Sequence, residues 1–413
     1  MAAELCHFVS MLLQNAVQSY RQDLEKIGCV TVASLCAGLD MLQYIADYAL
    51  QVWPSLHMSS ELQFRYFCAE LDPVKRSLLL ARKHQRLQVD HVFGDIRMLR
   101  KPCFDFKTRK FVKPQAPQIL ICGFACQDLS TLNNHPKPFD LQDPNHGVSA
   151  RTFHTTLQLI QQWQPSWVIM ENVPGICKAA LRTVLQLMFE AGYYSAHAKL
   201  NAMQFRKRIP SCARGRPEAV FQKVPALLQG YVRPSLQQVL DSLPPWVRSR
   251  SRGRGVRASK GKRWLVRSWR FEKKHGLATD SLASLRARLS NVPAAQKLTR
   301  QQMRLLVSRM AYLQKEGQVD ESFDDWVFGL DQSVDRAIVL RACTPCVTPN
   351  CVFWYQNRLM NPWEMAALQG VTLSEMAELR DQDASLVQSL AGNAFCTHVI
   401  ATLFVALLTE LTK

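Results

Sequence analysis

The sequence predicts an α/β fold in which a doubly wound, mostly parallel sheet is accompanied by a smaller basic domain. Two observations lead to this prediction. Short apolar runs alternate with amphipathic stretches of ten or more residues, which is typical of parallel strands covered by helices on both faces. The chain also has 413 residues, more than one core usually supports, so we expect two lobes. The expected strands are residues 30–35, 64–69, 89–93, 119–122 and 167–170.

Both ends of the chain are expected to form packed helices. Residues 5–16 place apolar side chains on one helical face, and no basic segment precedes them, which argues against a signal peptide. A second helix is expected over residues 397–411. Its apolar run, residues 399–408, is about half of the ~18–20 residues that a membrane span needs. We therefore expect a soluble protein that does not enter a membrane.

One segment holds the excess positive charge of the chain. The net charge is +18, and residues 206–309 alone contain 25 lysines and arginines against 4 acidic residues. This concentration favours a nucleic-acid partner over an anionic membrane surface or a merely solvated basic surface. The densest run, residues 248–263, is expected to be flexible until it meets nucleic acid, and it could equally be a nuclear import signal. The residues expected to contact nucleic acid in this run are Arg248, Arg250, Arg252, Arg254, Lys260, Lys262 and Arg263.

The cysteine content predicts free thiols and no metal site. Thirteen cysteines are an odd number and follow no regular spacing, which is typical of an intracellular protein. Cys343, Cys346 and Cys351 form a cluster, but no second cysteine pair or histidine lies near them to complete a zinc site.

Two predicted strands end in side chains that can do chemistry. Cys126 lies on the loop that follows strand 119–122, at the sheet edge where α/β proteins bind ligands. Its thiol could be activated as a thiolate by a positive neighbour, or it could be a buried apolar residue. Glu171 directly follows strand 167–170, where burial could raise its pKa and let it protonate a base nitrogen. The alternative is an ordinary turn residue.

A third segment carries two arginines at alternate positions, Arg206 and Arg208. In an extended segment both guanidinium groups point to one side, where they suit a phosphate or a pyrimidine carbonyl. A solvated basic strand would have the same pattern.

Taken in order, these three segments resemble the cytosine-5 DNA methyltransferase family, whose motifs read proline-cysteine-glutamine, ENV and QxRxR. Residues 34–40 resemble the cofactor turn of the family, and residues 70–72 and 94–96 resemble its next two motifs. Residues 358–370 and 391–394 resemble the two motifs near its C-terminus. The resemblance implies S-adenosylmethionine as cofactor and a Rossmann-like methyltransferase fold. The residues that it assigns to the cofactor are Leu35, Cys36, Ala37, Gly38, Leu39, Glu70, Leu71, Asp72, Asp95, Ile96 and Asn393.

The resemblance also implies an activity. Cys126 would attack carbon 6 of a flipped-out cytosine in DNA, Glu171 would hold or protonate ring nitrogen 3, and carbon 5 would receive the methyl group. Arg206 and Arg208 would position the base and its phosphates. Gln127 and Ser130 would contact the nucleic acid. The alternatives are methylation of transfer RNA and a catalytically inactive nucleic-acid-binding protein. The basic run favours the nucleus as the place of action.

The implied domain organisation has four parts. Residues 1–29 are expected to be an N-terminal helical extension, 30–208 the catalytic domain and 209–340 a basic target-recognition region. Residues 341–413 are expected to complete the catalytic domain.

The sequence departs from the family pattern in three places. Ala125 replaces the proline before the nucleophile, so other contacts must order the loop. In the cofactor turn, Cys36 replaces an aromatic residue and Asp40 replaces a glycine. The Asp40 carboxylate would repel the carboxylate of the cofactor unless it points away. The approach to Arg206, residues 201–203, is shorter than in the family.

Overall fold

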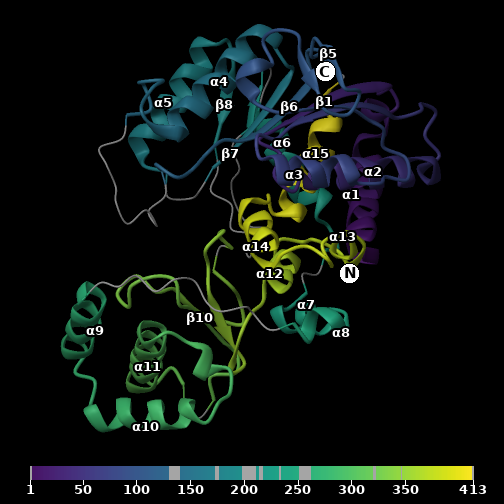
Figure 1. Ribbon diagram of the computed structural model, residues 1–413. Coiled ribbons are helices and arrows are strands. Elements are labelled where there is room, and N and C mark those ends of the chain that lie inside the picture. The colour runs from purple at the N-terminus through teal and green to yellow at the C-terminus, as the bar shows by residue number, and fades with distance from the viewer. Residues whose placement is uncertain are drawn as a thin grey trace. The chain divides into compact units, whose positions relative to one another are not determined.

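The computed structural model divides into two compact units (Figure 1). We call residues 2–232 with 394–413 the sheet unit, and residues 233–393 the insert unit. The described residues are 2–129, 140–172, 176–197, 211–213, 217–231, 234–250, 262–319, 322–345 and 347–411. The sheet unit thus contains residues from both ends of the chain.

The sheet unit is built on a seven-stranded sheet in the order β3-β2-β1-β6-β7-β9-β8. The first five strands in this order are parallel, and each matches a predicted strand to within one residue at either end. Their bounds are β1 Cys29–Leu35, β2 Gln63–Ala69, β3 Val89–Phe93, β6 Ile119–Gly123 and β7 Trp167–Glu171. The strand order reverses between β1 and β6, which is the switch point of a doubly wound sheet. The predicted fold class is confirmed.

Two short antiparallel strands extend the sheet beyond β7. β9 (Ser211–Ala213) pairs with β7, and β8 (Tyr194–Ala196) pairs with β9. The sheet unit therefore continues past residue 208, where the sequence placed the end of the catalytic domain.

Helices cover both faces of this sheet. On one face, α4 (Gly147–Trp163) and α5 (Lys178–Glu190) bury Phe153 and Met188 against alternate strand residues such as Leu35. The other face is covered by α1 (Ala2–Leu24), α2 (Met41–Val52), α6 (Pro217–Leu227) and α15 (Thr397–Leu408). Strands buried on both faces need apolar side chains at every position, which explains the continuous apolar runs in the sequence.

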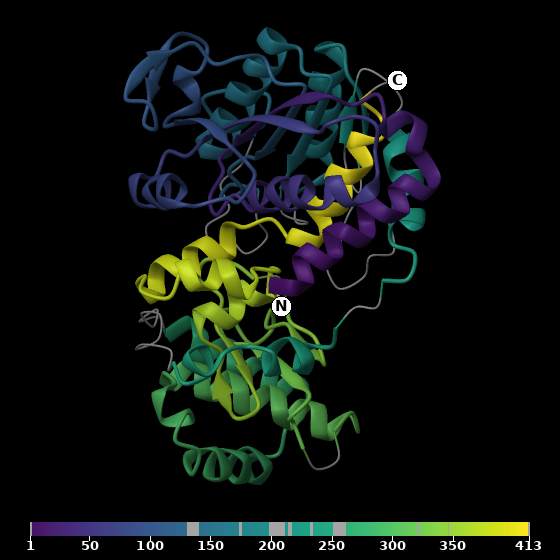
Figure 2. The ribbon, with the colours of Figure 1, turned by 90° about the vertical axis from the view of Figure 1, so that its right-hand side faces the viewer.

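The two terminal helices pack side by side in the sheet unit. Figure 2 shows α1 alongside α15, and both contact α6. Asn15 on α1 donates to the carbonyl of Leu227 at 2.9 Å. The ring of Phe404 on α15 lies 5.5 Å from that of Phe64 on β2. The helix predicted at the N-terminus is thus packed within the sheet unit.

The remaining elements of the sheet unit are shorter. They are η1 Trp53–Leu56, α3 Pro73–Ala81, η2 Ile96–Met98, β4 Cys103–Asp105 and β5 Lys110–Val112. In the described part of the chain, no single helix is both long and apolar enough to cross a membrane.

The insert unit combines an antiparallel sheet with helices. Its sheet has the order β11-β10-β12-β13, and its apolar core includes Leu305 and Trp354. The strands are β10 Trp326–Gly329, β11 Val339–Arg341, β12 Phe353–Tyr355 and β13 Arg358–Leu359. The helices are α7 Leu236–Asp241, α8 Pro245–Arg248, α9 Lys262–Lys274, α10 Thr279–Ser290, η3 Ala295–Lys297, α11 Arg300–Lys315, α12 Pro362–Leu368, α13 Leu373–Glu378 and α14 Ala384–Asn393. The basic run predicted to be flexible therefore begins at the end of α8 and ends in the first turn of α9.

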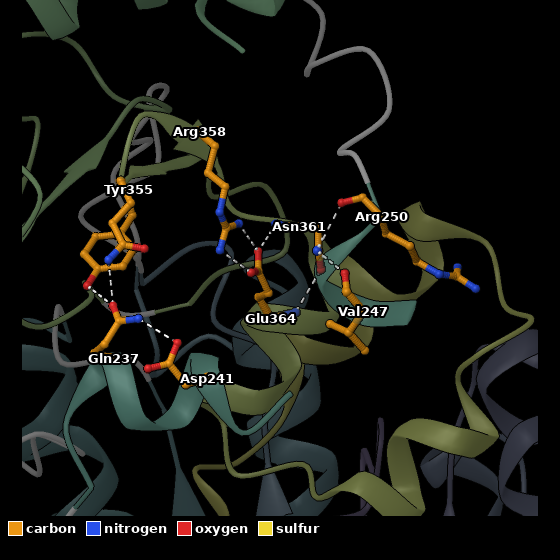
Figure 3. Close-up of polar contacts among 9 residues, drawn as sticks. Gln237, Asp241, Val247, Arg250, Tyr355, Arg358, Asn361 and Glu364 are labelled. Carbon is orange, nitrogen blue, oxygen red and sulfur yellow. Dashed lines mark hydrogen bonds and ion pairs between the residues drawn. The ribbon is translucent and has the colours of Figure 1, made fainter. Parts of the chain in front are cut away.

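Polar contacts hold α12 within the insert unit (Figure 3). Glu364 is fully buried and accepts two hydrogen bonds from the guanidinium of Arg358, at 2.6 and 2.8 Å. Asn361 caps the helix, and its amide donates to the carbonyls of Val247 at 2.9 Å and Arg250 at 3.3 Å. Residues 358–370, one of the segments that resemble the family, thus have a structural role in this unit.

Candidate active site

The turn after β1 is held in left-handed backbone conformation and tied to the end of β2. Cys36, Gly38 and Asp40 have φ angles of 55°, 56° and 45°. The Ala37 amide donates to the carbonyl of Ala69 at 3.0 Å. The Gly38 amide donates to Oε2 of Glu70 at 2.7 Å. The Glu70 carboxylate, directly after β2, thus fixes the turn that the sequence assigned to the cofactor.

Glu70 keeps hydrogen-bonding capacity beyond these contacts. Its Oε1 accepts from the Asp72 amide at 2.9 Å, so among the contacts of the described residues each carboxylate oxygen keeps one lone pair for a ligand hydroxyl. Leu71, next to it, is 65% exposed and offers an apolar surface beside the carboxylate. Asp72 has a different role: its Oδ1 caps α3 by accepting from the amides of Val74 and Lys75.

Asp95 and Ile96 follow β3 at the same edge of the sheet. Hydrogen bonds from Arg97 lower the pKa of Asp95, so its carboxylate is charged at neutral pH. The Ile96 side chain is 9% exposed. A charged acceptor beside an apolar side chain suits the amino group of a purine ring.

The two substitutions in the turn point inward. The Asp40 carboxylate is 2% exposed and accepts from the Tyr66 hydroxyl at 2.9 Å and from the Gln43 amide at 2.9 Å. Burial raises the pKa of Asp40 to about 6. A hydrogen bond to the Cys122 thiol, followed by burial, raises the pKa of Cys36 well above its ordinary value. The repulsion expected between Asp40 and a bound carboxylate is therefore avoided.

Side-chain contacts order the loop that carries Cys126. The Asn172 amide donates to the carbonyl of Phe124 at 2.9 Å. Asp128 and Ser149 exchange two hydrogen bonds: the Ser149 amide donates to the Asp128 carboxylate at 2.9 Å, and the Asp128 amide donates to the Ser149 hydroxyl at 3.1 Å. These contacts fix both sides of the nucleophile where the family's proline is absent, and sequence reasoning named none of them.

The structure brings Cys126 and Glu171 together. β6 and β7 are parallel neighbours with Gly123 opposite Glu171. The Glu171 Oε2 lies 3.5 Å from the position that a Cβ at Gly123 would take, so the carboxyl reaches over the strand that leads to Cys126. Thiol and carboxyl are close enough for the charge of Glu171 to affect the Cys126 pKa.

Burial raises the pKa of both groups. The pKa of Glu171 rises to about 7, because its carboxyl lies among many protein atoms even though the side chain keeps a solvent-exposed face. The pKa of Cys126 is raised mainly by burial and then by the charge of Glu171. Because Glu171 keeps its proton up to about pH 7, burial is the cause that matters for the thiol near neutrality. The sequence suggested a positive neighbour that would lower the thiol pKa, and the described residues shift it the other way.

Phe395 is a site residue that sequence reasoning missed. Its Cζ lies 3.2 Å from the Cβ position of Gly123, so the ring occupies the space that a side chain there would need. Phe395 and Glu171 therefore both approach Gly123. An aromatic residue directly after the motif at 391–394 was the available signal.

Several predicted contacts lie outside the described residues. These are Ser130, Arg206, Arg208, Arg252, Arg254 and Lys260, and the side chains of Lys262 and Arg263 are likewise not described.

The remaining predicted contacts have defined surroundings. Gln127 and Arg248 are exposed, whereas the Arg250 guanidinium stacks 4.0 Å over the ring of Trp363. Asn393 is exposed in the insert unit and donates to the carbonyl of Ser389 at 2.7 Å.

No group of three or more potential metal ligands occurs among the described residues. Cys346 of the predicted cysteine cluster lies outside them, and the Cys351 thiol donates to the sulfur of Met365 at 3.4 Å.

Comparison with known proteins agrees with this arrangement. Residues 70–211, which begin directly after β2 and include β3, β6 and β7, match the model of the C-5 cytosine-specific DNA methylase family. This part of the chain is therefore similar to a C-5 cytosine-specific DNA methylase domain. It is 27% identical over 416 aligned residues to DNA (cytosine-5-)-methyltransferase DMT5 of Cryptococcus neoformans var. grubii. That match covers 91% of this chain and 17% of the relative, so the chain spans only a small part of the fungal protein.

Two solved structures of methyltransferases align with most of this chain at low sequence identity. Dnmt2 of S. pombe has 14% identity and a TM-score of 0.46, with 92% of this chain and 98% of that chain covered. The methyltransferase EhMeth of Entamoeba histolytica has 12% identity and a TM-score of 0.43, with 92% and 98% covered.

Proposed function

We propose that this chain transfers a methyl group from S-adenosylmethionine to carbon 5 of a flipped-out cytosine in DNA. The observation that carries the proposal is the convergence of Cys126 and Glu171 at the carboxyl edge of β6 and β7. A cysteine nucleophile beside a carboxyl that is protonated near neutral pH is suited to adding a thiol to a pyrimidine ring.

The residues of the turn fit the cofactor. Glu70 has acceptor capacity for ribose hydroxyls, and the exposed Leu71 offers apolar surface beside it. S-adenosylmethionine, when bound, supplies an electrophilic methyl group. The turn and Glu70 would hold the nucleoside portion, and Asp95 would accept a hydrogen bond from the amino group of the base.

Cys126 and Glu171 divide the chemistry on the cytosine. The Cys126 thiol gives its proton to solvent and its sulfur forms a bond to carbon 6, while the Glu171 proton passes to ring nitrogen 3 and prevents negative charge from building up on the ring. After carbon 5 has been methylated, water takes the proton of carbon 5, the double bond between carbons 5 and 6 forms again as the bond from carbon 6 to the Cys126 sulfur breaks, and the proton on nitrogen 3 returns to the Glu171 carboxylate. Because the pKa of the Cys126 thiol is raised, we propose that the cationic side chains of Arg206 and Arg208 lower it during the reaction.

The insert unit offers a surface for the DNA backbone. The inner face of α9 carries Phe271, which is buried, and Glu272, which pairs with Arg304 at 2.7 Å. The outer face carries no acidic residue. Its exposed side chains are Val266, Arg267, Trp269, Arg270, Lys273 and Lys274. Four cations around an exposed tryptophan suit phosphates and bases.

This surface has a quantitative test. Removing one cation that pairs with a phosphate reduces the slope of log affinity against log salt by about 0.9. We expect Arg270→Gln with Lys273→Gln to reduce that slope, measured by fluorescence anisotropy on a DNA duplex. The matched control is Lys297→Gln with Arg300→Gln, two exposed cations of the same unit, and an equal effect of both pairs would contradict a specific role for α9.

The domain roles follow from the same proposal. Residues 30–208 and 341–413 would supply the catalytic machinery, residues 209–340 would recognise the target, and the basic run would favour action in the nucleus.

Covalent trapping tests the activity. A DNA duplex with 5-fluorocytosine at candidate sites, incubated with S-adenosylmethionine, is expected to form a stable adduct with the wild-type chain and none with Cys126→Ser. Cys177→Ser, which removes an exposed thiol, is the matched control and should still form the adduct. A parallel assay on transfer RNA distinguishes the alternative substrate. Binding of DNA without any adduct would favour an inactive nucleic-acid-binding protein.

A further inference from the structure

The cofactor turn has a second set of anchors that the family motifs do not include. Arg82 follows α3, and its guanidinium donates to two consecutive main-chain carbonyls of the turn: Nη2 to that of Leu39 at 2.7 Å and Nη1 to that of Asp40 at 3.1 Å. Both carbonyls lie at the end of the turn, whereas Glu70 holds the amide of Gly38 in its middle.

We propose that Arg82 is a positioning residue for the methyl donor, which it serves by fixing the carbonyls at 39 and 40. This inference rests on the proposed function, because it takes residues 36–40 to be the cofactor turn. Arg82 itself need not touch the donor.

Arg82 is itself held in place. Its guanidinium lies 4.1 Å over the ring of Tyr44, and Nη1 also donates to Oε1 of Gln43 at 3.3 Å. The same Oε1 lies 3.0 Å from Nε2 of His84. A planar guanidinium stacked on a ring and hydrogen-bonded at its edge loses little freedom when it binds the turn.

The loop after Arg82 is anchored to α2 by a buried carboxylate. Asp47 is 5% exposed and accepts from three successive main-chain amides, those of Gln85, Arg86 and Leu87, at 3.1, 2.7 and 2.6 Å. The loop is therefore held against α2. Because α2 begins directly after the turn, the turn, the helix and the loop hold one another in place.

The identity of Asp40 explains why such a support is needed. A non-glycine residue at φ 45° costs about 1 kcal/mol relative to ordinary backbone. The family places a glycine here, which would adopt this conformation freely. In this chain the strained conformation is maintained from both sides, by Tyr66 and Gln43 on the Asp40 side chain and by Arg82 on its carbonyl.

A supporting residue of this kind has a defined kinetic signature. Loosening the turn weakens binding of the donor but leaves Cys126 and Glu171 in place. We therefore expect the KM for S-adenosylmethionine to rise while kcat at saturating donor stays near the wild-type value.

The test compares three variants of the full chain. Arg82→Met removes the hydrogen-bond donors and keeps the apolar stem, whereas Arg82→Lys keeps one charged donor group. The control is Arg86→Met, the same substitution at an exposed side chain of the same loop. Calorimetric titration with S-adenosylhomocysteine is expected to give about tenfold weaker binding for Arg82→Met. Arg82→Lys should be intermediate, Arg86→Met should match the wild type, and affinity for a DNA duplex should be unchanged in all three.

The outcomes separate this inference from the proposed function. If the wild type binds S-adenosylhomocysteine and Arg82→Met binds equally well, the positioning role is wrong. If Arg82→Met does not fold, Arg82→Lys decides, and wild-type affinity in that variant overturns the role. If the wild type itself does not bind, the proposed cofactor, and with it the proposed function, is refuted.

Discussion

Replacing Glu171 by glutamine is predicted to make the protein more stable at alkaline pH but not at acidic pH. The pKa of Glu171 is raised from 4.5 to about 7 in the folded chain. The folded state therefore binds the proton more tightly than the unfolded state, and the stability this provides is complete below about pH 4.5 and lost as the pH rises through 7. A glutamine carries no charge at any pH, so the variant does not incur this loss.

The magnitude follows from the size of the pKa change. A rise from 4.5 to about 7 corresponds to at most about 3.4 kcal/mol. Because the side chain keeps an exposed face, solvent screens much of this penalty, and we expect about 1 kcal/mol. The measurement is urea unfolding of wild type and Glu171→Gln at about pH 4.5 and about pH 8.

The matched control is Glu61→Gln, which removes the same charge from an exposed position. Relative to wild type, Glu171→Gln should have a larger free energy of unfolding at about pH 8 than at about pH 4.5. Glu61→Gln should show no such dependence on pH. A stability difference between wild type and Glu171→Gln that is the same at both pH values would refute the desolvation argument. Methyl transfer should also be lost in Glu171→Gln, because the amide has no acidic proton to give to ring nitrogen 3.

Three further substitutions test the packing and the loop. Ala125→Pro should preserve or raise turnover in a methylation assay, because it restores a fixed φ before the nucleophile; abolished activity would show that the loop is ordered differently. Lys223→Met should destabilise the sheet unit by about 3 kcal/mol, because it leaves Glu410 buried without its cation. Thermal unfolding should show most of that stability recovered in a Lys223→Met, Glu410→Leu double variant, and no recovery would argue against a buried ion pair. Gly392→Ala should cost about 3 kcal/mol, since its Cβ would lie 2.0 Å from the Pro349 nitrogen, and unchanged urea unfolding would contradict that contact.

The sequence predicted the parallel strands and the edge at which the site lies because both follow from local patterns. Strands buried on two faces are apolar throughout, and polar residues directly after them mark the carboxyl edge of the sheet. Cys126 and Glu171 could be paired on this basis, since both follow such strands.

Contacts between residues far apart in the sequence could not be predicted from local patterns. Arg82 lies more than forty residues from the turn that it holds, and in sequence it is one of several basic residues close together. Phe395 reaches the site only because the last helix returns to the sheet. Asp72 has a structural role that its place in the cofactor motif did not reveal, because its side chain caps α3.

The pKa of Cys126 illustrates a further limit. Reasoning from the loop alone suggested a thiol that a positive neighbour could activate, and burial in the folded chain raises the pKa instead. The direction depends on how many protein atoms surround the sulfur, which no local spacing reveals.

The position of α15 between α1, α2 and α6 has a consequence for synthesis on the ribosome. The apolar residues that these helices and β2 present to α15, Phe64 among them, remain uncovered until residues 397–408 have been translated. The insert unit is contiguous and can fold as soon as its own residues have been translated, but the sheet unit cannot close until residues 397–408 have followed. A nascent chain stalled before residue 397 would thus expose apolar surface on the incomplete sheet unit. It would depend on chaperones to stay in solution.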